Sequence, residues 1–153
     1  MNKPASLRQA LEAALPDLKV NPDKLKVFID AGGVATTATR SLSFEYAYVL
    51  NVVVCDYAEH PDQLIVAVLI WLRRHQPELL ANRERMRDGF KFEVDIISHA
   101  AVDISIELKL TERVGVKSEA GKLTIEHFDE PSLDPEEGCE WELAIGGGPW
   151  PTT

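Results

Sequence analysis

The stretch SLSFEYAYVLNVVVC, residues Ser41–Cys55, decides the fold class of this chain. Apolar and aromatic side chains fall on every second position from Leu42 to Val54, and mostly small or polar side chains lie between them. Because side chains alternate between two faces in an extended strand, this period predicts a β-strand with one buried face. A strand of this length would span roughly 50 Å at about 3.4 Å per residue, longer than a small domain normally covers. We therefore expect a bend or a protruding end.

Further segments alternate in the same way and also predict strands. They lie at 25–29, 90–96, 102–110, continuing past Gly115 to Val116, and 123–128. Glycine-containing turn signals, such as Gly32-Gly33 and Asp88-Gly89, accompany them. Since each strand must bury one face, we expect the sheet core to consist of Phe44, Tyr46, Leu50, Val52, Phe92, Val94, Ile104, Ile106 and Leu108.

Two segments have helical spacing. Apolar residues from Leu7 to Leu15 predict a short amphipathic helix that Pro16 ends, and a second helix runs from Asp62 to His75. The second helix has almost no polar face, so we expect it to be buried both in the core and under a neighbouring subunit. Leu64, Val68 and Trp71 form the row that we predict to face the neighbour. The order of elements predicts an α+β fold, a mostly antiparallel sheet of long strands with two helices packed on one face.

The charge of −9 is concentrated near the C-terminus. Residues 123–153 hold eight acidic side chains and no Lys or Arg, which leaves a net charge of −1 for residues 1–122. We therefore expect one domain at 1–128 and an acidic C-terminal arm or tail at 129–153. A nearly neutral body does not favour a nucleic-acid binder. We also expect no membrane span, because the longest apolar run has nine residues, Leu64–Leu72.

No residue pattern predicts a cofactor or metal. Cys55 and Cys139 stand alone, and the four histidines lie in different elements. Asp56, Glu59 and Asp62 form a carboxylate cluster that could transfer protons in a small enzyme, although a solvated loop and helix cap is the simpler interpretation. Arg83, Arg85 and Arg87 belong to a locally basic segment, which we interpret as facing an acidic protein surface.

Several strings of residues resemble a known family. They are TRSLSFEY at 39–46, HPD at 60–62, HQPELL at 75–80, DGFKFEVDI at 88–96 and DISIELKLTERV at 103–114. Together with the N-terminal helix, they resemble the tail completion protein R family of contractile-tailed temperate phages over most of residues 1–128. None of these strings is a catalytic motif, so their order and number carry the resemblance.

The resemblance implies a structural virion protein without enzyme activity, with a tail-terminator-like fold. It implies action at the head-proximal end of the tail, where completion proteins stop polymerisation and prepare the tail for head joining, after assembly in the host cytoplasm. Proteins at that position commonly form rings, frequently sixfold, and contact tail tube, sheath or neck proteins. The alternatives are another neck or adaptor ring of the same particle and a small cytoplasmic enzyme using carboxylates near Asp56.

A ring also gives the acidic arm a predicted role. Each copy presents the same basic segment and the same arm, so the arm of one subunit can bind the arginines of the next. Exposed ion pairs contribute only about 0–1 kcal/mol each, so we expect burial of Trp141 and Trp150 on the neighbour to supply the strength. The alternative is a flexible solubilising tail.

Overall fold

The computed structural model describes residues 1–36, 40–129, 144–145 and 148–149. The helices are α1 (Lys3–Ala14), α2 (Pro16–Val20), the single 3-10 turn η1 (Pro22–Lys24), α3 (Pro61–His75), α4 (Pro77–Ala81) and α5 (Arg83–Gly89). The strands are β1 (Leu25–Thr36), β2 (Phe44–Tyr57), β3 (Phe90–Ile96), β4 (Val102–Glu119), β5 (Lys122–Phe128), β6 (Ala144–Ile145) and β7 (Gly148–Pro149). The predicted α+β class is confirmed.

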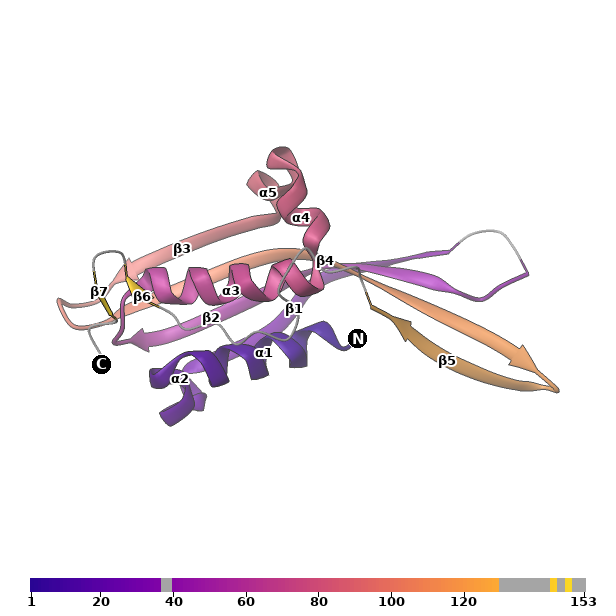
Figure 1. Ribbon diagram of the computed structural model, residues 1–153, viewed down its shortest axis with the longest axis horizontal. Coiled ribbons are helices and arrows are strands. Elements are labelled where there is room, and N and C mark those ends of the chain that lie inside the picture. Colours follow the sequence, from indigo (N-terminus) through magenta and orange to yellow (C-terminus); the bar gives the residue numbers. More distant parts are fainter. Residues whose placement is uncertain (37–39, 130–143, 146–147, 150–153) are drawn as a thin grey trace.

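The main sheet is antiparallel and has the order β1-β2-β4-β3, with β5 also paired to β4. Its centre is the long ladder between β2 and β4, in which Leu50 lies opposite Leu108 and Val52 opposite Ile106. These side chains share one face and are fully buried. In Figure 1, α1 and α3 lie against this central part of the sheet, while β3 runs along the margin beyond α3.

The helices bury leucines against this face. Leu7 and Leu11 of α1, Leu18 of α2 and Leu15 between the two helices are at most 1% exposed. Prolines begin α2, α3 and α4, where the missing N–H of proline costs no helical hydrogen bond. Trp71 of α3 donates its indole N–H to Ser6 Oγ of α1 at 3.1 Å, which ties the two helices together. The predicted short helix therefore exists, and it starts four residues earlier than the leucine pattern indicated.

The predicted outward row of α3 is wrong. Leu64 and Val68 are fully buried and Trp71 is 4% exposed, so these three residues are part of the core of their own chain. The exposed side of α3 carries Asp62, Val66 and Arg73 instead. An apolar pattern on every face could not tell which row packs inward, because α1 and the sheet together enclose more of the helix than one layer can.

The predicted core residues in the central parts of β2 and β4 are buried, as expected, but those predicted in β3 are not. Ile104, Ile106 and Leu108 are at most 2% exposed, whereas Phe92 is 62% and Val94 is 37% exposed. Phe92 and Val94 lie opposite Ile106 and Ile104 and therefore on the same face of the sheet. They are exposed because the helices cover β1, β2 and β4 and leave the margin at β3 open (Figure 1). Phe44 and Tyr46 are only partly buried.

Two hairpins extend beyond the helices, which confirms the expectation of a protruding strand end. Figure 1 shows the β1–β2 hairpin and the β4–β5 hairpin diverging from the body at the same end of the sheet. We call them the two arms. Val34 is 64% exposed, Leu123 is 55% and Ile125 is 65%. Their partners are Tyr46, Ser118 and Val116, so they continue the face that forms the core in the body.

The core placement predicts a large effect for Ile106→Ala. Removing a fully buried branched side chain should lower the free energy of unfolding by about 2–5 kcal/mol, because transfer and cavity costs add. Denaturant unfolding followed by circular dichroism measures this difference. Val20→Ala is the matched control, since Val20 is 77% exposed on α2 and its truncation should change stability by less than about 0.5 kcal/mol. Equal losses for both variants would contradict the assigned core.

Candidate partner interface

The candidate site begins at a gap in the pairing of β4. One edge of β4 pairs with β2, and the other pairs with β3 up to Leu108 and with β5 from Arg113. Within the described residues, positions 109–112 therefore have no strand partner on the second edge. Backbone groups at such a gap need other partners, because an unpaired buried N–H or C=O group is costly. Side chains from α1 and from the end of α3 supply them.

The gap is closed by Gln76 and Lys3. Gln76 Oε1 accepts from the Thr111 backbone N–H at 3.2 Å, and Gln76 Nε2 donates to Thr111 Oγ1 at 3.1 Å. The Lys3 ammonium donates to the Thr111 carbonyl and, at 2.6 Å, to Gln76 Oε1. Gln76 directly follows α3 as its C-cap, and it is 4% exposed. Thr111 of β4 is thus bound to both the C-terminal end of α3 and the N-terminal end of α1.

The neighbouring residue, Glu112, completes this network from the other side. Its carboxylate accepts from the backbone N–H groups of Asn2 and Lys3 at 2.7 and 3.3 Å and from the Tyr48 hydroxyl at 2.7 Å. An anion at a helix N-terminus is favourable, because the first N–H groups have no partner within the helix. Burial, and then the hydrogen bond and charge of Glu112, raise the pKa of Tyr48 far above its ordinary value, so the phenol stays protonated.

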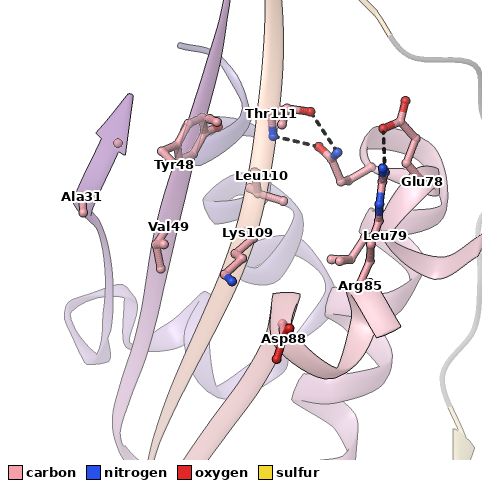
Figure 2. Close-up of a pocket in the computed structure, with 13 residues that line it drawn as sticks. Ala31, Tyr48, Val49, Glu78, Leu79, Arg85, Asp88, Lys109, Leu110 and Thr111 are labelled. Atoms are coloured by element: carbon pink, nitrogen blue, oxygen red, sulfur yellow. Dashed lines mark hydrogen bonds and ion pairs between the residues drawn. The ribbon is translucent and has the colours of Figure 1, made fainter. Parts of the chain in front are cut away.

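A pocket of about 650 Å³ opens beside this network on the outer face of the sheet. Small side chains form its floor: Ala31 of β1, and Ala47 and Val49 of the neighbouring strand β2. Leu79 of α4 lines it from the other side, as Figure 2 shows. The complete lining is Ala31, Gly32, Ala47, Tyr48, Val49, Gln76, Glu78, Leu79, Arg85, Asp88, Lys109, Leu110 and Thr111. An apolar hollow of this size can hold one large side chain of a partner.

Charged side chains surround the pocket. Arg85 forms an ion pair with Glu78 at 3.6 Å, with 65% and 54% of the two side chains exposed. Asp88 and Lys109 also line the pocket, and Figure 2 shows the positions of all four. Because so exposed a pair contributes only about 0–1 kcal/mol, Arg85 is available to exchange Glu78 for an acidic group of a partner.

The predicted arginines do not act together. All three lie on α5 and are exposed, but only Arg85 lines the outer-face pocket. Arg83 and Arg87 line a separate hollow of about 620 Å³, together with Leu80, Glu84, Met86 and Phe90. The side chain of Asn82 caps α5 by accepting from the N–H groups of Glu84 and Arg85. The capped turn therefore presents basic groups to two different surfaces.

The residues of the predicted carboxylate cluster at the start of α3 belong to a turn and a helix cap. Asp62 is 3.4 Å from His60, whose ring also accepts from the Asp62 N–H and caps α3. Asp56 adopts a left-handed conformation with φ 55°, and its backbone N–H donates to the Asp103 carboxylate at 2.7 Å. Of the three predicted carboxylates, only Glu59 lines the nearby hollow of about 400 Å³. This arrangement forms a turn and a helix cap.

Part of the predicted site lies outside the described residues. Trp141 and Trp150 fall there, so their role as interface residues stays a prediction, as does the division between domain and arm at residue 129. Within the described ranges, no three His, Cys, Asp or Glu side chains gather as metal ligands. Also within those ranges, no helix has the length and apolar character needed to cross a membrane.

Sequence reasoning missed the residues on which the site depends. Lys3, Gln76 and Glu112 attracted no functional interpretation, although Glu112 carried a visible signal. It stands between Leu110 and Val114 on the apolar face of β4, where a carboxylate interrupts the alternation. A charged group at such a position is almost never buried without partners. The pocket itself had no sequence signal, since it depends on where α4 and α5 pack.

Comparison with known proteins identifies a family. The family model described as P2 phage tail completion protein R (GpR) matches residues 1–131. The tail completion protein R of Escherichia phage P2 is 45% identical over 147 residues, which covers 96% of this chain and 95% of that protein. No solved structure matches.

The protruding arms, the exposed apolar face and the pocket are surfaces of the kind that proteins use to contact other proteins. The chain belongs to the phage tail completion protein R family. It therefore has a structural role in a phage tail and interacts with other tail components, as the resemblance implied.

The buried network predicts that Glu112→Ala is strongly destabilising. The substitution leaves the Asn2 and Lys3 N–H groups and the Tyr48 hydroxyl without their acceptor. Two of the three donors, the Lys3 N–H and the Tyr48 hydroxyl, are buried, and each unsatisfied buried donor costs about 1–3 kcal/mol. We therefore expect a loss of at least about 2 kcal/mol in the free energy of unfolding. Glu112→Gln keeps an acceptor oxygen and should lose less.

Glu107→Ala is the control for this experiment, because Glu107 is an exposed carboxylate on the same strand. Its loss should stay within about 0.5 kcal/mol in the same denaturant titration. If Glu112→Ala unfolds at the denaturant concentration of the wild type, the carboxylate does not hold α1 to the sheet.

Proposed function

We propose that this protein closes the head-proximal end of a phage tail as a ring of identical copies and prepares that end for head joining. The observation that carries the proposal is the apolar face that continues uncovered onto the two arms. Val34, Leu123 and Ile125 are each more than half exposed there. Exposed apolar surface of this kind marks protein interaction sites, and family membership supplies the tail as the setting.

The sheet also suits a closed ring. Within the described residues, β1 and β3 are its outer strands in the body, and they differ in length and surroundings. Contact between two different surfaces of neighbouring copies is heterologous, and it ends in a ring when the rotation closes. A ring caps a tube without leaving a surface for further addition. Six copies is the number to test first, following the symmetry that the resemblance implies.

The outer-face pocket is proposed as the contact for a partner in the tail. Its small-residue floor and the exchangeable Arg85–Glu78 pair suit an apolar anchor residue flanked by an acidic group. Arg83 and Arg87 face a second apolar hollow and add positive charge on the other side of α5. The proposed partners are a second copy and the tail tube, sheath or neck proteins.

The alternative function, another neck or adaptor ring of the same particle, differs in its partner. Purified protein should bind tail tubes under the proposed function and the head connector under the alternative. Cosedimentation with each separated component distinguishes the two. A catalytic role for the carboxylates near Asp56 has less support, since Asp62 lies against His60 and the backbone N–H groups of Asp56 and Asp62 build a turn and a helix cap.

The arm surface predicts a defect in assembly without a defect in folding. In a phage that lacks its own copy of this protein, Ile125→Asp should reduce plaque titre at least about 100-fold, because a buried carboxylate would oppose contact. Unjoined tails should accumulate and be visible by electron microscopy. Isolated Ile125→Asp protein should unfold at the wild-type temperature, since the side chain is 65% exposed in the subunit.

Val20→Asp is the matched control, because Val20 is 77% exposed on α2, away from the arms (Figure 1). It should support normal titre. A normal titre with Ile125→Asp would contradict contact through the arms. Light scattering of the isolated protein over a range of concentrations tests the ring itself. A mass that stays at one subunit at every concentration, together with no ring density at purified tail ends in electron microscopy, would overturn it.

The pocket rim predicts a charge-dependent step. Arg85→Glu reverses one exposed charge, so stability should change by less than about 1 kcal/mol while binding to tail components falls about 10-fold or more. Wild-type binding should weaken as salt rises from 0.05 to about 0.5 M, because salt screens exposed charges. Lys19→Glu reverses an exposed charge on α2 and serves as the control. Equal binding by both variants and the wild type would remove Arg85 from the interface.

A further inference from the structure

An apolar strip runs along the β3 margin of the sheet, half-buried where it begins and exposed along β3. It begins in the hollow below α5 and continues on alternate residues of β3. We call it the β3 strip, and it consists of Leu80, Met86, Phe90, Phe92, Val94 and Ile96. Phe92 is 62% and Ile96 is 81% exposed. Because their cross-strand partners belong to the core face, the strip is a part of the core that α1 and α3 do not reach.

The strip also has an open backbone edge. β3 pairs with β4 on one side, and no strand pairs with its other side within the described residues. An edge strand with exposed apolar side chains is a ready template for another strand. A seven-residue edge of this kind offers a length of about 23 Å. The strip therefore fits an extended segment with apolar side chains on one face.

The direction of β5 brings one segment to this place. β5 and β3 pair with the same edge of β4, and both are antiparallel to it, so they run in the same direction. Phe128 lies opposite Arg113 and Phe90 opposite Leu108, five positions further along β4, or about 17 Å. The chain that leaves β5 at Phe128 therefore points toward the start of β3.

The charge of Asp129 agrees with this direction. Burial and the nearby Lys3 lower the pKa of His75, and the Asp129 carboxylate opposes that shift by raising it. His75 is the last residue of α3, directly before the turn that leads into α4 and α5. The C-terminal segment thus starts beside the elements that carry the strip.

The sequence of that segment matches the strip. Trp141, Leu143 and Ile145 alternate with Glu140, Glu142 and Ala144, which is the period of a strand with one apolar face. Residues 129–153 contain seven acidic side chains and no Lys or Arg. Arg83 and Arg87 stand beside the hollow where the strip begins. Apolar pattern and charge are therefore both complementary.

We propose that the C-terminal segment 130–153 docks on the β3 strip of its own copy, with Trp141, Leu143 and Ile145 against the apolar side chains. Eleven residues separate Phe128 from Glu140 and can span up to about 37 Å, more than the distance to β3. A tethered segment has an effective concentration in the millimolar range, so its own copy outcompetes a dilute neighbour. The acidic segment is thereby assigned to the same chain rather than to the next subunit. This inference does not depend on ring formation.

Disulfide trapping in the full-length chain tests the proposal. Cys139 of the segment is kept, and Cys55→Ser removes the other thiol. Single cysteines then replace Phe92, Val94 or Ile96 on the strip, or Glu93 or Asp95 on the opposite face of β3 as matched controls. Protein at low micromolar concentration is oxidised and run on a non-reducing gel. Cysteines whose Cα atoms lie within about 7 Å can join.

We expect at least one strip variant to form an intrachain disulfide, visible as a faster monomer band, in at least half of the molecules. The Glu93→Cys and Asp95→Cys controls should stay below about a tenth. A disulfide-linked dimer as the main product would overturn the proposal in favour of a neighbouring copy. Equal yields on both faces, or no disulfide in any variant, would also overturn it.

A second measurement tests the charges. Arg83→Glu combined with Arg87→Glu should reduce the intrachain yield at least about threefold, and so should 0.5 M salt in the original variant. Arg85→Glu is the control, because Arg85 faces the outer-face pocket on the other side of α5. A yield that the double reversal leaves unchanged would contradict a role of Arg83 and Arg87 in binding the segment.

Discussion

The buried carboxylate of Glu112 is the interaction on which the rest of the structure depends. It fixes the first turn of α1 and the ring of Tyr48 to β4 at the point where the arms leave the body. One residue earlier, Thr111 is bound by Gln76 and Lys3. Two adjacent residues of one strand thus hold both long helices. Together with the hydrogen bonds from Arg8 to the Leu25 carbonyl and from Trp71 to Ser6, they define how far along the sheet α1 sits.

The second constraint is that the apolar face of the sheet is longer and wider than its helical cover. The two helices enclose the centre, where Leu50, Val52, Ile106 and Leu108 are fully buried. The same face continues exposed along β3 in one direction and onto the arms in the other. Fully burying a Phe or Ile side chain contributes roughly 1.5–3 kcal/mol, so burial of these exposed side chains by a partner would contribute strongly to binding. The fold is stable alone, yet much of its apolar surface can be buried only by additional contacts.

Much of the fold followed from side-chain period alone. Alternation over Ser41–Cys55 identified β2 and its protruding end, and leucine spacing identified α1. Burial of individual rows did not follow, because it depends on which elements pack together. Phe92 alternates as regularly as Ile106, yet one is exposed and the other buried, since a helix lies over only one of them. For the same reason Leu64, Val68 and Trp71 were assigned to a neighbour. The pocket depends on where the short helices α4 and α5 pack beside positions 109–112 of β4, and the local sequence does not predict that packing.

The unbroken length of β4 has a mechanical consequence. This strand has 18 residues, or about 60 Å, and it carries the core of the body in its first half and an arm in its second half. No loop separates the two, so the arm joins the body through continuous strand backbone. A load on the tip at Leu123 or Ile125 reaches the strand residues that hold both helices before it reaches any flexible connection. A partner bound to the arm would therefore transmit force along β4 to Thr111 and Glu112, the residues that hold the two long helices.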